Sequence, residues 1–509
     1  MVEQYDLLIV GAGPAGLAAA MYAARIGRRV ALVEKDRIGG DCTWSLCIPF
    51  RTLIKAARVA HQIRVAGQYG ITVDQTRPVT VPASAGATIS SPDDADDASA
   101  SVTANLQAVF GRMRAVVADI AFREESPSAL RRQGIQLYLG RARFVNPYTI
   151  RVGDVELAGR RILLTTGARP FVPSIPGLRQ VRHYTYQTLW DMPALPKHLL
   201  VLGAGPTGCE MAQAFRRLGA EVTLVEARER LLSHDEPDAA ALIADVLAAE
   251  GVDVRLNHSV RRVWQDGETI HLASDDDEIA GDALLVTTGR VPQITGLGLE
   301  VAGVEYGRNG IQVDRYLRTT RPHILAAGDC TGGYHLIHYA AWQGLTAARN
   351  ALLPWATQGH TDVVPWTTFT DPEVAHVGLT EAQAREIYGD RISTTTWPIS
   401  RIDRALAEGD TTGFVKLVYR RGRIRSGRLL GVTIVAGSAG EMIHEWVLAL
   451  QGHIKLSQLI RSMHVYPTYT QGNVEIADSV LSERLIAGQI DRMAGRLDHM
   501  AARLAHLLR

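Results

Sequence analysis

Cysteine is scarce in this chain of 509 residues, and neither positive nor negative charge is in excess. The four cysteines, at positions 42, 47, 209 and 330, are too few for the disulfide framework of a small secreted protein. Lys and Arg number 54 and Asp and Glu number 53, so no global field favours nucleic acid or acidic lipid. No apolar run reaches the roughly 18 to 20 residues that a helix needs to cross a bilayer.

The N-terminus enters its first predicted strand almost at once. The strand YDLLIV begins at Tyr5 and runs directly into the glycine turn GAGPAG, which leaves no room for a signal peptide. We therefore expect a cytoplasmic protein with reduced cysteines. The apolar content of 46% is sufficient for buried cores, and the length predicts about three or four domains.

Residues 7–35 have the pattern of a strand, a glycine-rich turn, a helix and a second strand. Gly11 allows the tight turn, Gly13 lets the backbone approach a pyrophosphate, and Gly16 lets the helix pack closely on the strand. The helix N-terminus then presents free N–H groups and a positive dipole end to the phosphates. Glu34 follows Gly16 by eighteen residues, at the strand end where a carboxylate can bind ribose hydroxyls. The segment therefore predicts a dinucleotide site.

The same pattern recurs over residues 198–227. Its three glycines are Gly203, Gly205 and Gly208. Glu226 again follows the third glycine by eighteen residues, and a carboxylate there would bind a free 2′-hydroxyl and repel a 2′-phosphate. Two such units predict two dinucleotides, with NADH favoured over NADPH at the second. Arg228 and Arg230 follow closely and keep NADPH as an alternative.

Three further apolar segments are predicted strands that end beside the bound nucleotides. Residues 162–170 (ILLTTGARP) and 284–292 (LLVTTGRVP) each end in a glycine turn suited to a chain crossover. Residues 323–330 (HILAAGDC) are a buried strand that brings Asp329 to its end. The Asp329 carboxylate would either hold a ribityl chain or serve as a simple cap of the strand.

Residues 39–53, GGDCTWSLCIPFRTL, contain Cys42 and Cys47 about thirty residues after the first glycine turn. This CxxxxC pair, the two GxGxxG turns and the AAGD strand together resemble the flavoprotein disulfide reductases, a family that includes dihydrolipoamide dehydrogenase, glutathione reductase and mercuric reductase. The resemblance extends over about residues 5 to 484. It implies an α/β fold with two Rossmann-like dinucleotide-binding domains plus an α+β C-terminal dimerisation domain. It also implies FAD on the first unit, a pyridine nucleotide on the second, and a homodimer.

The resemblance further implies domain boundaries and cofactor contacts. The expected domains are an FAD-binding domain over residues 1–160 and 295–360, an NAD(P)-binding domain over 161–294, a dimerisation domain over 361–484 and an amphipathic helical tail over 485–509. Residues 367–384 and 431–443 resemble the interface domain of the family. The additional contacts implied for FAD are Pro14, Ala15, Gly40, Asp41, Arg51, Ala142, Thr166, Gly167, Leu336, Ile337 and His338. The contacts implied for the nicotinamide dinucleotide include Val260 and Gly289.

Within the family the two cysteines have separate roles. Cys47, nearer the flavin, would exchange electrons with it, and Cys42 would attack the substrate disulfide. A bridge between them is geometrically demanding, because residues five apart in an ideal helix point about 140° away from each other and an irregular first turn is needed. A thiolate at a helix start beside the flavin would also have a lowered pKa. Two packed free thiols are the alternative.

The sequence departs from the family just after the second cysteine, where CIPFR replaces the usual CIPSK. Phe50 stands in place of a small polar residue. Arg51 replaces the lysine that normally lies by the flavin and pairs with a glutamate of the second unit, here Glu210. An Arg51–Glu210 pair would keep positive charge near the flavin, although arginine does not give up its proton. A salt bridge without catalytic meaning is the alternative.

A second departure lies in HVYPTYTQG, residues 464–472, where disulfide-reducing members read HxHPTxxE. His464 is kept, but Tyr466 and Gln471 replace the histidine base and the glutamate that orients it. A phenol with a pKa near 10 is a poor proton shuttle at neutral pH, and losing a positioned acid–base typically costs about a hundred- to ten-thousandfold in rate. Efficient dihydrolipoamide oxidation is therefore not expected. The tyrosine resembles mercuric reductase, but the C-terminal AARLAHLLR lacks the vicinal cysteines of that enzyme.

Two segments lie outside the family pattern. Residues 74–102 are rich in Pro, Ser, Ala and Asp, a composition that predicts a disordered or loosely packed insertion. In the tail over 485–509, apolar residues alternate at spacings of four and three, which predicts a helix that packs on the dimer or forms a coiled coil. Because its polar face is basic, peripheral contact with a membrane surface is a second interpretation.

These observations predict an FAD-dependent NAD(P)H oxidoreductase. Electrons would pass through flavin to a Cys42–Cys47 redox-active disulfide and on to a disulfide, sulfur or metal acceptor. Two alternatives stay open. In one, the cysteines are silent and the flavin reduces a quinone or oxygen directly. In the other, the chain is a catalytically weak flavin-containing binding or regulatory protein, tethered by its C-terminal helix.

Overall fold

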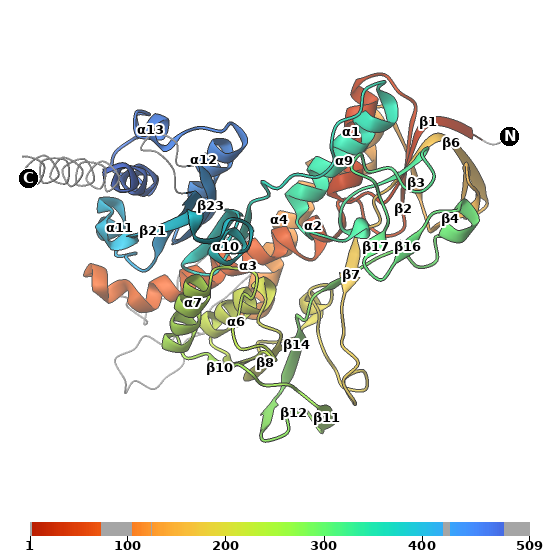
Figure 1. Ribbon diagram of the computed structural model, residues 1–509. Coiled ribbons are helices and arrows are strands. Elements are labelled where there is room, and N and C mark those ends of the chain that lie inside the picture. Colours follow the sequence, from red (N-terminus) through yellow and green to blue (C-terminus); the bar gives the residue numbers. More distant parts are fainter. Residues whose placement is uncertain (1–2, 73–103, 124, 421–427, 483–509) are drawn as a thin grey trace, which may run out of the picture. The chain divides into compact units, whose positions relative to one another are not determined.

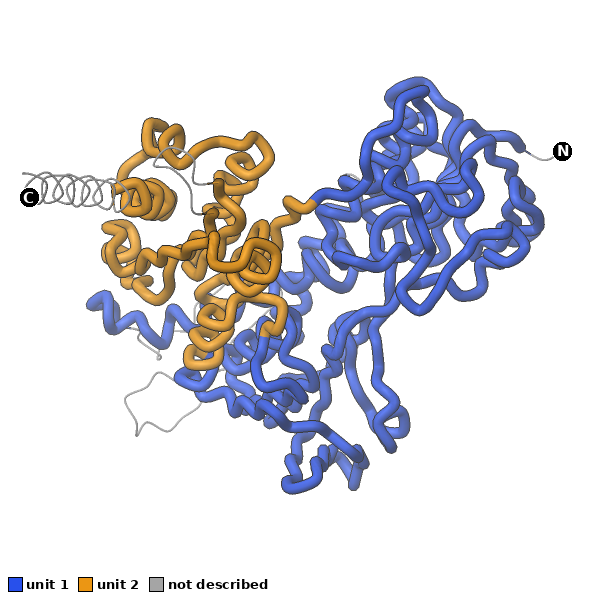
Figure 2. Tube along the Cα trace, viewed as in Figure 1, with its two compact units in different colours: residues 1–231, 247–361 blue, residues 232–246, 362–509 orange. Residues whose placement is uncertain are grey.

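The structure is a computed structural model. It describes residues 3–72, 104–123, 125–420 and 428–482. The predicted insertion over 74–102 and the predicted tail over 485–509 lie outside the described residues. Two compact units make up the chain, one of residues 1–231 and 247–361 (unit 1) and one of residues 232–246 and 362–509 (unit 2), as Figure 2 shows. The division of unit 1 into an FAD-binding and an NAD(P)-binding domain stays a prediction.

Unit 1 begins with a mixed sheet. Its strands are β1 (Glu3–Val10), β2 (Val30–Glu34), β3 (Ile135–Leu139), β4 (Ala142–Asn146), β5 (Thr149–Val152), β6 (Val155–Leu164) and β18 (Ile324–Ala326). They lie in the order β3-β2-β1-β6-β5-β4, with β18 also paired to β6. In this sheet β1, β2, β3, β6 and β18 pair in parallel, whereas β5 pairs antiparallel with β4 and β6. Leu7, Leu8 and Ile9 on β1 are fully buried. Strands that are apolar on both faces are typical of a parallel sheet covered on both sides.

Helix α1 (Pro14–Arg25) connects β1 to β2 and is built from small residues, PAGLAAAMYAAR. Its neighbour in space is α9 (Ile337–Leu352), far away in the sequence (Figure 1). A Cβ added at Gly344 of α9 would lie 2.0 Å from the carbonyl oxygen of Ala15. The two helices therefore approach each other as closely as only glycine and alanine allow, which explains the small residues of this face.

A second sheet in unit 1, a parallel one, repeats the same plan. Its strands are β8 (His198–Leu202), β9 (Glu221–Val225), β10 (Asp253–Arg255) and β14 (Ala283–Val286), in the order β10-β9-β8-β14. Helix α6 (Pro206–Leu218) connects β8 to β9, as predicted. A three-stranded antiparallel sheet follows, with β11 (Arg262–Asp266), β12 (Thr269–Ala273) and β13 (Glu278–Gly281). The two predicted crossover segments end in short strands, β7 (Ala168–Pro170) and β15 (Arg290–Pro292), which pair with each other.

The other described α-helices of unit 1 and one two-stranded hairpin complete this unit. They are α2 (Gly40–Trp44), α3 (Cys47–Val65), α4 (Leu106–Arg123), α5 (Pro127–Arg132), α8 (Leu299–Ala302), β16 (Tyr306–Gly307) and β17 (Gly310–Ile311). The long helix α3 packs against α6. This contact places the N-terminal part of α3, with the second cysteine, next to the second dinucleotide unit.

Unit 2 contains one antiparallel sheet with helices. Its strands are β19 (Trp366–Thr368), β20 (Glu373–Gly378), β21 (Ile392–Pro398), β22 (Phe414–Arg420) and β23 (Leu429–Ala436), in the order β19-β20-β23-β22-β21. Its helices are α7 (Pro237–Ala249, most of which belongs to this unit), α10 (Glu381–Tyr388), α11 (Asp403–Glu408), α12 (Ala439–Gln451) and α13 (Leu456–Leu459). Trp446 of α12 is fully buried in the core that this helix forms with β23. The predicted fold class, two Rossmann-like units with an α+β C-terminal part, is confirmed.

Among the described residues, no helix combines the length and the apolar character that crossing a membrane requires.

A buried histidine in unit 2 leads to a prediction about pH. His376 on β20 is fully buried; its Nε2 lies 3.1 Å from Gly378 O and its Nδ1 lies 2.7 Å from Thr433 Oγ1. A carbonyl can only accept, so Nε2 carries the proton and Nδ1 accepts from the hydroxyl of Thr433, which describes a neutral ring. Burial lowers the pKa of His376 to about 4.

Because the unfolded chain binds a proton below about pH 6.5 while the folded ring stays neutral, the free energy of unfolding should fall as the pH decreases from about 6.5 to about 4. The loss amounts to at most ~1.4 kcal/mol per pH unit. Urea unfolding at pH 7.5 and pH 5.0 should show a smaller acid loss in His376→Gln than in the parent protein. Equal losses in both would contradict this prediction.

Candidate active site

The first glycine turn is shaped to receive a pyrophosphate. Gly11 has φ +106°, and a Cβ added there would lie 2.3 Å from Thr165 O. A Cβ at Gly16 would lie 1.9 Å from Gly11 O, whereas one at Gly13 would meet no atom within 4 Å. The first and third glycines are therefore required by packing, and the second faces open space at the N-terminus of α1, where Pro14 and Ala15 begin the helix. These residues fit the pyrophosphate of FAD.

The second glycine turn has the same construction. Gly203 also has φ +106°, and a Cβ at Gly208 would lie 1.9 Å from Gly203 O. Gly205 again opens to free space. Glu226 at the end of β9 accepts hydrogen bonds from Ala204 N at 2.8 Å and Arg228 N at 3.0 Å.

The corresponding carboxylate of the first unit, Glu34, accepts from Ala12 N at 2.7 Å and Asp36 N at 2.8 Å. Both carboxylates are thereby fixed at the strand ends, at the place where a ribose would lie.

The two cysteines are brought together by a break between two helices. Helix α2 ends at Trp44, and α3 begins at Cys47. Between them, Leu46 has φ −124° and ψ −85°, which is not helical. The irregular turn that a bridging pair requires is therefore present. Both cysteines are free thiols, and a hydrogen bond joins the Cys42 and Cys47 side chains.

One proton is shared unequally between these two sulfurs. The hydrogen bond from Cys42 lowers the pKa of Cys47, with further lowering by the charges of Arg51 and Arg290. The same hydrogen bond raises the pKa of Cys42, together with burial and the negative charges of Cys47, Glu125 and Asp41. Cys47, at the N-terminus of a long helix, is therefore the more acidic sulfur of the pair, and Cys42 is the one that keeps its proton.

Arg51 pairs with Glu210, as expected from the sequence. The Glu210 side chain is almost completely buried, while the Arg51 side chain is 32% exposed. The pair links α3 to α6, since Arg51 lies one turn after Cys47 and Glu210 lies in the first turns of the second-unit helix.

The Phe50 side chain points into an aromatic core. Its ring centroid lies 5.6 Å from that of Trp190, and Trp190 lies 5.4 Å from Phe110 of α4, both pairs in edge-to-face geometry. Phe50 is 2% exposed. The departure from the small polar residue of the family therefore fills a hydrophobic core between α3, α4 and the chain near Trp190.

Truncating this ring should lower stability strongly. Phe50→Ala is expected to reduce the free energy of unfolding by about 3–5 kcal/mol, because it leaves a cavity against Trp190. Phe50→Leu, which keeps most of the volume, should cost less than about 1.5 kcal/mol. Urea unfolding followed by far-UV circular dichroism measures both. If Phe50→Ala leaves stability unchanged but alters the flavin spectrum, the ring faces the flavin instead.

Two site residues were missed by the sequence reasoning, Arg290 and Tyr186. Arg290 Nη1 lies 2.7 Å from Asp329 Oδ2, and its Nη2 lies 3.2 Å from Asp41 Oδ2. The Tyr186 hydroxyl donates to Asp41 Oδ2 at 3.0 Å, and Arg290 lies over its ring, 5.3 Å from the centroid. The sequence could have indicated Arg290, because it is the only charged residue of the segment 284–292 and directly follows the glycine of its turn.

The remaining predicted FAD contacts lie at element ends in unit 1. Thr166 Oγ1 donates to Gln293 O at 2.6 Å, and Gly167 has φ +69°. Ala142 begins β4, and Gly40 begins α2 with φ +59°. Leu336 precedes α9, Ile337 begins it and His338 follows. For the nicotinamide dinucleotide, Val260 packs on the core of the second sheet and Gly289 has φ +120°.

The positions predicted to replace the acid–base pair, Tyr466 and Gln471, lie in unit 2. The Tyr466 hydroxyl donates to Asp403 Oδ2 at 2.6 Å, and this hydrogen bond raises the pKa of Tyr466. Gln471 instead interacts with Glu475, whose pKa is raised mainly by burial. Nε2 of His464 lies 2.7 Å from Glu445 Oε1. Tyr466 and Gln471 therefore each have a carboxylate partner of their own, and Tyr466 stays protonated at neutral pH.

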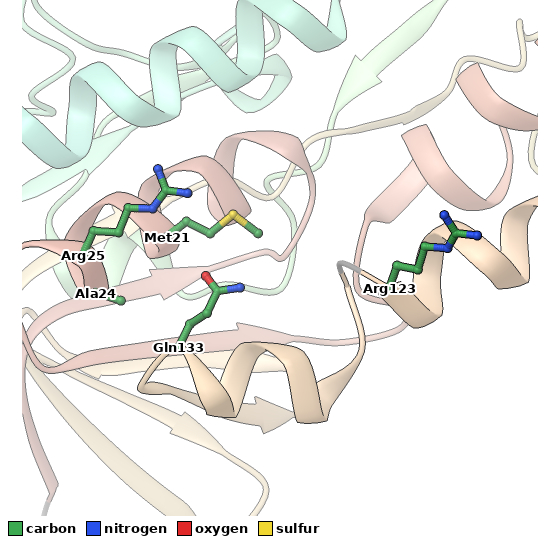
Figure 3. A pocket seen from close by; sticks show the side chains of 5 residues that line it. All are labelled: Met21, Ala24, Arg25, Arg123 and Gln133. Atoms are coloured by element: carbon green, nitrogen blue, oxygen red, sulfur yellow. The ribbon is translucent and has the colours of Figure 1, made fainter.

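A surface hollow of about 580 Å³ lies elsewhere in unit 1 (Figure 3). Its lining residues are Met21, Ala24, Arg25, Arg123 and Gln133. None of these is a predicted site residue. No group of three or more His, Cys, Asp or Glu side chains suited to a metal ion occurs in the part of the chain that the structure describes.

Comparison with known proteins agrees with the geometry. Residues 5–344 match the family model described as pyridine nucleotide-disulphide oxidoreductase, and residues 364–477 match the dimerisation domain of the same family. The chain is 35% identical to a mercuric reductase of Streptomyces lividans over 478 residues, which cover 92% of this chain and 94% of that protein. It is 30% identical to a dihydrolipoyl dehydrogenase of Chlamydia muridarum over 482 residues, covering 92% and 96%.

A solved structure with the same fold is the HOCl-induced flavoprotein disulfide reductase RclA from Escherichia coli. It superposes with a TM-score of 0.79 at 29% identity and covers 93% of this chain and 99% of that one. A Cu(II) complex of RclA superposes with a TM-score of 0.78, at 29% identity and 91% and 98% coverage. By its sequence, its fold and its thiol pair, the chain belongs to the FAD-dependent pyridine nucleotide-disulphide oxidoreductases, a family of enzymes that act on sulfur groups with NAD(P)H.

Proposed function

We propose that this enzyme uses NAD(P)H to reduce a thiophilic metal ion at the Cys42–Cys47 pair. The observation that carries the proposal is the combination of a half-buried, hydrogen-bonded cysteine pair, in which the pKa of Cys47 is lowered, with a tyrosine, Tyr466, held protonated by Asp403 where the family has its histidine base. Reduction of a disulfide to two thiols consumes two protons as well as two electrons. A metal ion takes up electrons alone, so it needs no proton shuttle.

The residues present fit FAD on the first unit. The turn of Gly11, Gly13 and Gly16 would hold its pyrophosphate, Glu34 its ribose, and Asp329 its ribityl chain. When bound, FAD would supply the redox chemistry that links hydride donation by NAD(P)H, a two-electron step, to electron transfer into a thiol pair. The protein supplies the charge environment, since Arg51 and Arg290 stabilise negative charge at Cys47.

The thiol pair supplies both ligands and electrons. A soft metal ion would bind the Cys47 thiolate first and then displace the proton of Cys42 to solvent. The two sulfurs would then form the Cys42–Cys47 disulfide and release two electrons. A divalent ion that accepts both leaves as the neutral metal, whereas two Cu(II) ions leave as two Cu(I). The similarity to mercuric reductases and to a reductase solved with Cu(II) supports this acceptor class.

Anaerobic reduction tests the proposal. The purified holoenzyme should take up four electrons per subunit and show a long-wavelength thiolate-to-flavin absorption band at two. NADH oxidation should be stimulated at least about a hundredfold more by Hg(II) or Cu(II) than by lipoamide or glutathione disulfide. Complete bleaching at two electrons without the band would make the cysteines silent, and strong quinone reduction would then favour a direct flavin reductase.

We also propose that NADH is preferred over NADPH, because Glu226 is held at the ribose position of the second unit. The value of kcat/KM should be at least about tenfold higher for NADH. Equal values would mean that Arg228 and Arg230 bind the 2′-phosphate. The match to the dimerisation domain further supports a homodimer, which sedimentation of the holoenzyme would measure.

A further inference from the structure

The short stretch between the two cysteines is anchored from outside at nearly every residue. Thr43 Oγ1 donates to Glu125 Oε1 at 2.9 Å, and Trp44 Nε1 donates to Ile38 O at 2.6 Å. The carbonyl oxygen of Ser45 accepts from Trp190 Nε1 at 3.0 Å, in a buried hydrogen bond. The four residues between the cysteines, which comprise the end of α2 and the two-residue loop before α3, would otherwise adopt many conformations.

Asp41, the residue before the first cysteine, has the most contacts. Its Oδ2 accepts from the Tyr186 hydroxyl at 3.0 Å and pairs with Arg290 at 3.2 Å, while its Oδ1 accepts from Gln187 Nε2 at 3.0 Å. Three of the contacts to the loop therefore come from a single short segment that contains Tyr186, Gln187 and Trp190. Tyr186, Gln187 and Trp190 belong neither to a glycine turn nor to the predicted cofactor contacts.

That segment is itself fixed to the second dinucleotide unit. Tyr184 N donates to Leu284 O at 2.7 Å, and Val286 N donates to Tyr184 O at 2.8 Å. These backbone hydrogen bonds attach the chain to the outer edge of β14, the last strand in the order β10-β9-β8-β14, whose residues are all buried. The segment is thus a rigid support rather than a loose connection, and it starts two residues before Tyr186.

We propose that Tyr186 and Trp190 are positioning residues that hold residues 41–45 so that Cys42 and Cys47 keep their reduced, hydrogen-bonded arrangement. This inference rests on the proposed redox role of the pair. Trp190 acts on the backbone between the cysteines through Ser45 O, and Tyr186 acts on the charge beside Cys42 through Asp41.

The charge of Asp41 explains in which direction the dithiol–disulfide equilibrium should shift when these residues are changed. The Asp41 carboxylate lies next to the pair and disfavours a thiolate, and its hydrogen bond from Tyr186 and its ion pair with Arg290 reduce that effect. If the Tyr186 hydroxyl is removed, Asp41 opposes negative charge on the hydrogen-bonded pair more strongly, and in the first place at Cys42. If the Trp190 N–H is removed, the loop loses its buried anchor in the reduced form. Both changes destabilise the dithiol relative to the disulfide.

The test measures the dithiol–disulfide equilibrium of the holoenzyme without turnover. The parent protein, Tyr186→Phe and Trp190→Phe are equilibrated in dithiothreitol redox buffers, the thiols are trapped by alkylation, and the Cys42–Cys47 disulfide is quantified by mass spectrometry. Each variant should shift the equilibrium constant about tenfold toward the disulfide, which corresponds to about 30 mV for a two-electron couple.

Phe110→Leu is the matched control. It weakens the packing on the Trp190 ring but leaves the Trp190–Ser45 hydrogen bond in place, so its melting temperature should fall without a shift in the equilibrium. If Tyr186→Phe and Trp190→Phe lower the melting temperature but leave the equilibrium constant within twofold, their role is structural and the inference is wrong. If the parent protein forms no disulfide at any buffer ratio, the proposed function itself falls.

Discussion

Replacement of Cys42 with serine should lower the rate of NADH-dependent metal reduction by about a thousandfold or more. Cys42 is the protonated member of the pair, and its thiol hydrogen bond stabilises the Cys47 thiolate. Serine cannot form the disulfide and is a poor ligand for a soft metal ion. Because the binding sites for FAD and NADH do not depend on this sulfur, NADH should still bleach the flavin absorbance of the variant. Stopped-flow absorbance and steady-state turnover measure the two steps separately.

Cys209→Ser is the matched control for this experiment. Cys209 is buried in α6, where its Sγ donates to Ala204 O at 3.4 Å, and a serine hydroxyl can make the same hydrogen bond. Turnover of this variant should stay within about twofold of the parent protein. A Cys42→Ser enzyme that reduces its acceptor at the parental rate would rule out electron transfer through the pair. Quinone or oxygen reduction directly from the flavin would then be the better account.

The parts of the site that could be predicted from the sequence depend on contacts within a short stretch of chain. The packing of Gly16 against Gly11, the fixing of Glu34 at a strand end and the neighbourhood of Cys42 and Cys47 are all encoded by local spacing. The resemblance to the family added the pairing of distant elements, since no local pattern indicates which glutamate faces Arg51.

The positioning contacts could not be predicted, because they join residues that are far apart in the chain. Tyr186 is 145 residues from Asp41, and Arg290 is 249 residues from it. No periodicity or motif relates such positions. Phe50 illustrates a related limit: the departure from the family marks an altered position, but only the structure shows that the ring turns toward Trp190. For Tyr466 the sequence indicated a poor base, and the structure adds Asp403 as the reason why its proton is retained.

A large effect on stability is expected in unit 2, at a buried lysine with three carboxylates. Lys416 Nζ lies 3.0 Å from Glu236 Oε2, 3.0 Å from Asp238 Oδ2 and 3.1 Å from Glu381 Oε2. These hydrogen bonds join β22 to the start of α7 and to α10. The Glu236 side chain is 1% exposed, and its Oε1 accepts from Glu381 N at 2.6 Å. Lys416→Met should therefore lower the free energy of unfolding by about 3–5 kcal/mol, because it leaves a buried carboxylate without its cation.

A double variant separates this electrostatic cause from lost packing. In Lys416→Met with Glu236→Gln, the buried charge is removed while the glutamine oxygen can still accept from Glu381 N. Asp238 and Glu381 remain charged, but they are 44% and 26% exposed and can be hydrated. In urea unfolding, the double variant should regain at least half of the free energy of unfolding that Lys416→Met loses. Lys455→Met, at an exposed lysine, should stay within about 0.5 kcal/mol of the parent protein. A double variant as unstable as Lys416→Met alone would show that the lysine stem, rather than its charge, holds α7 in this unit.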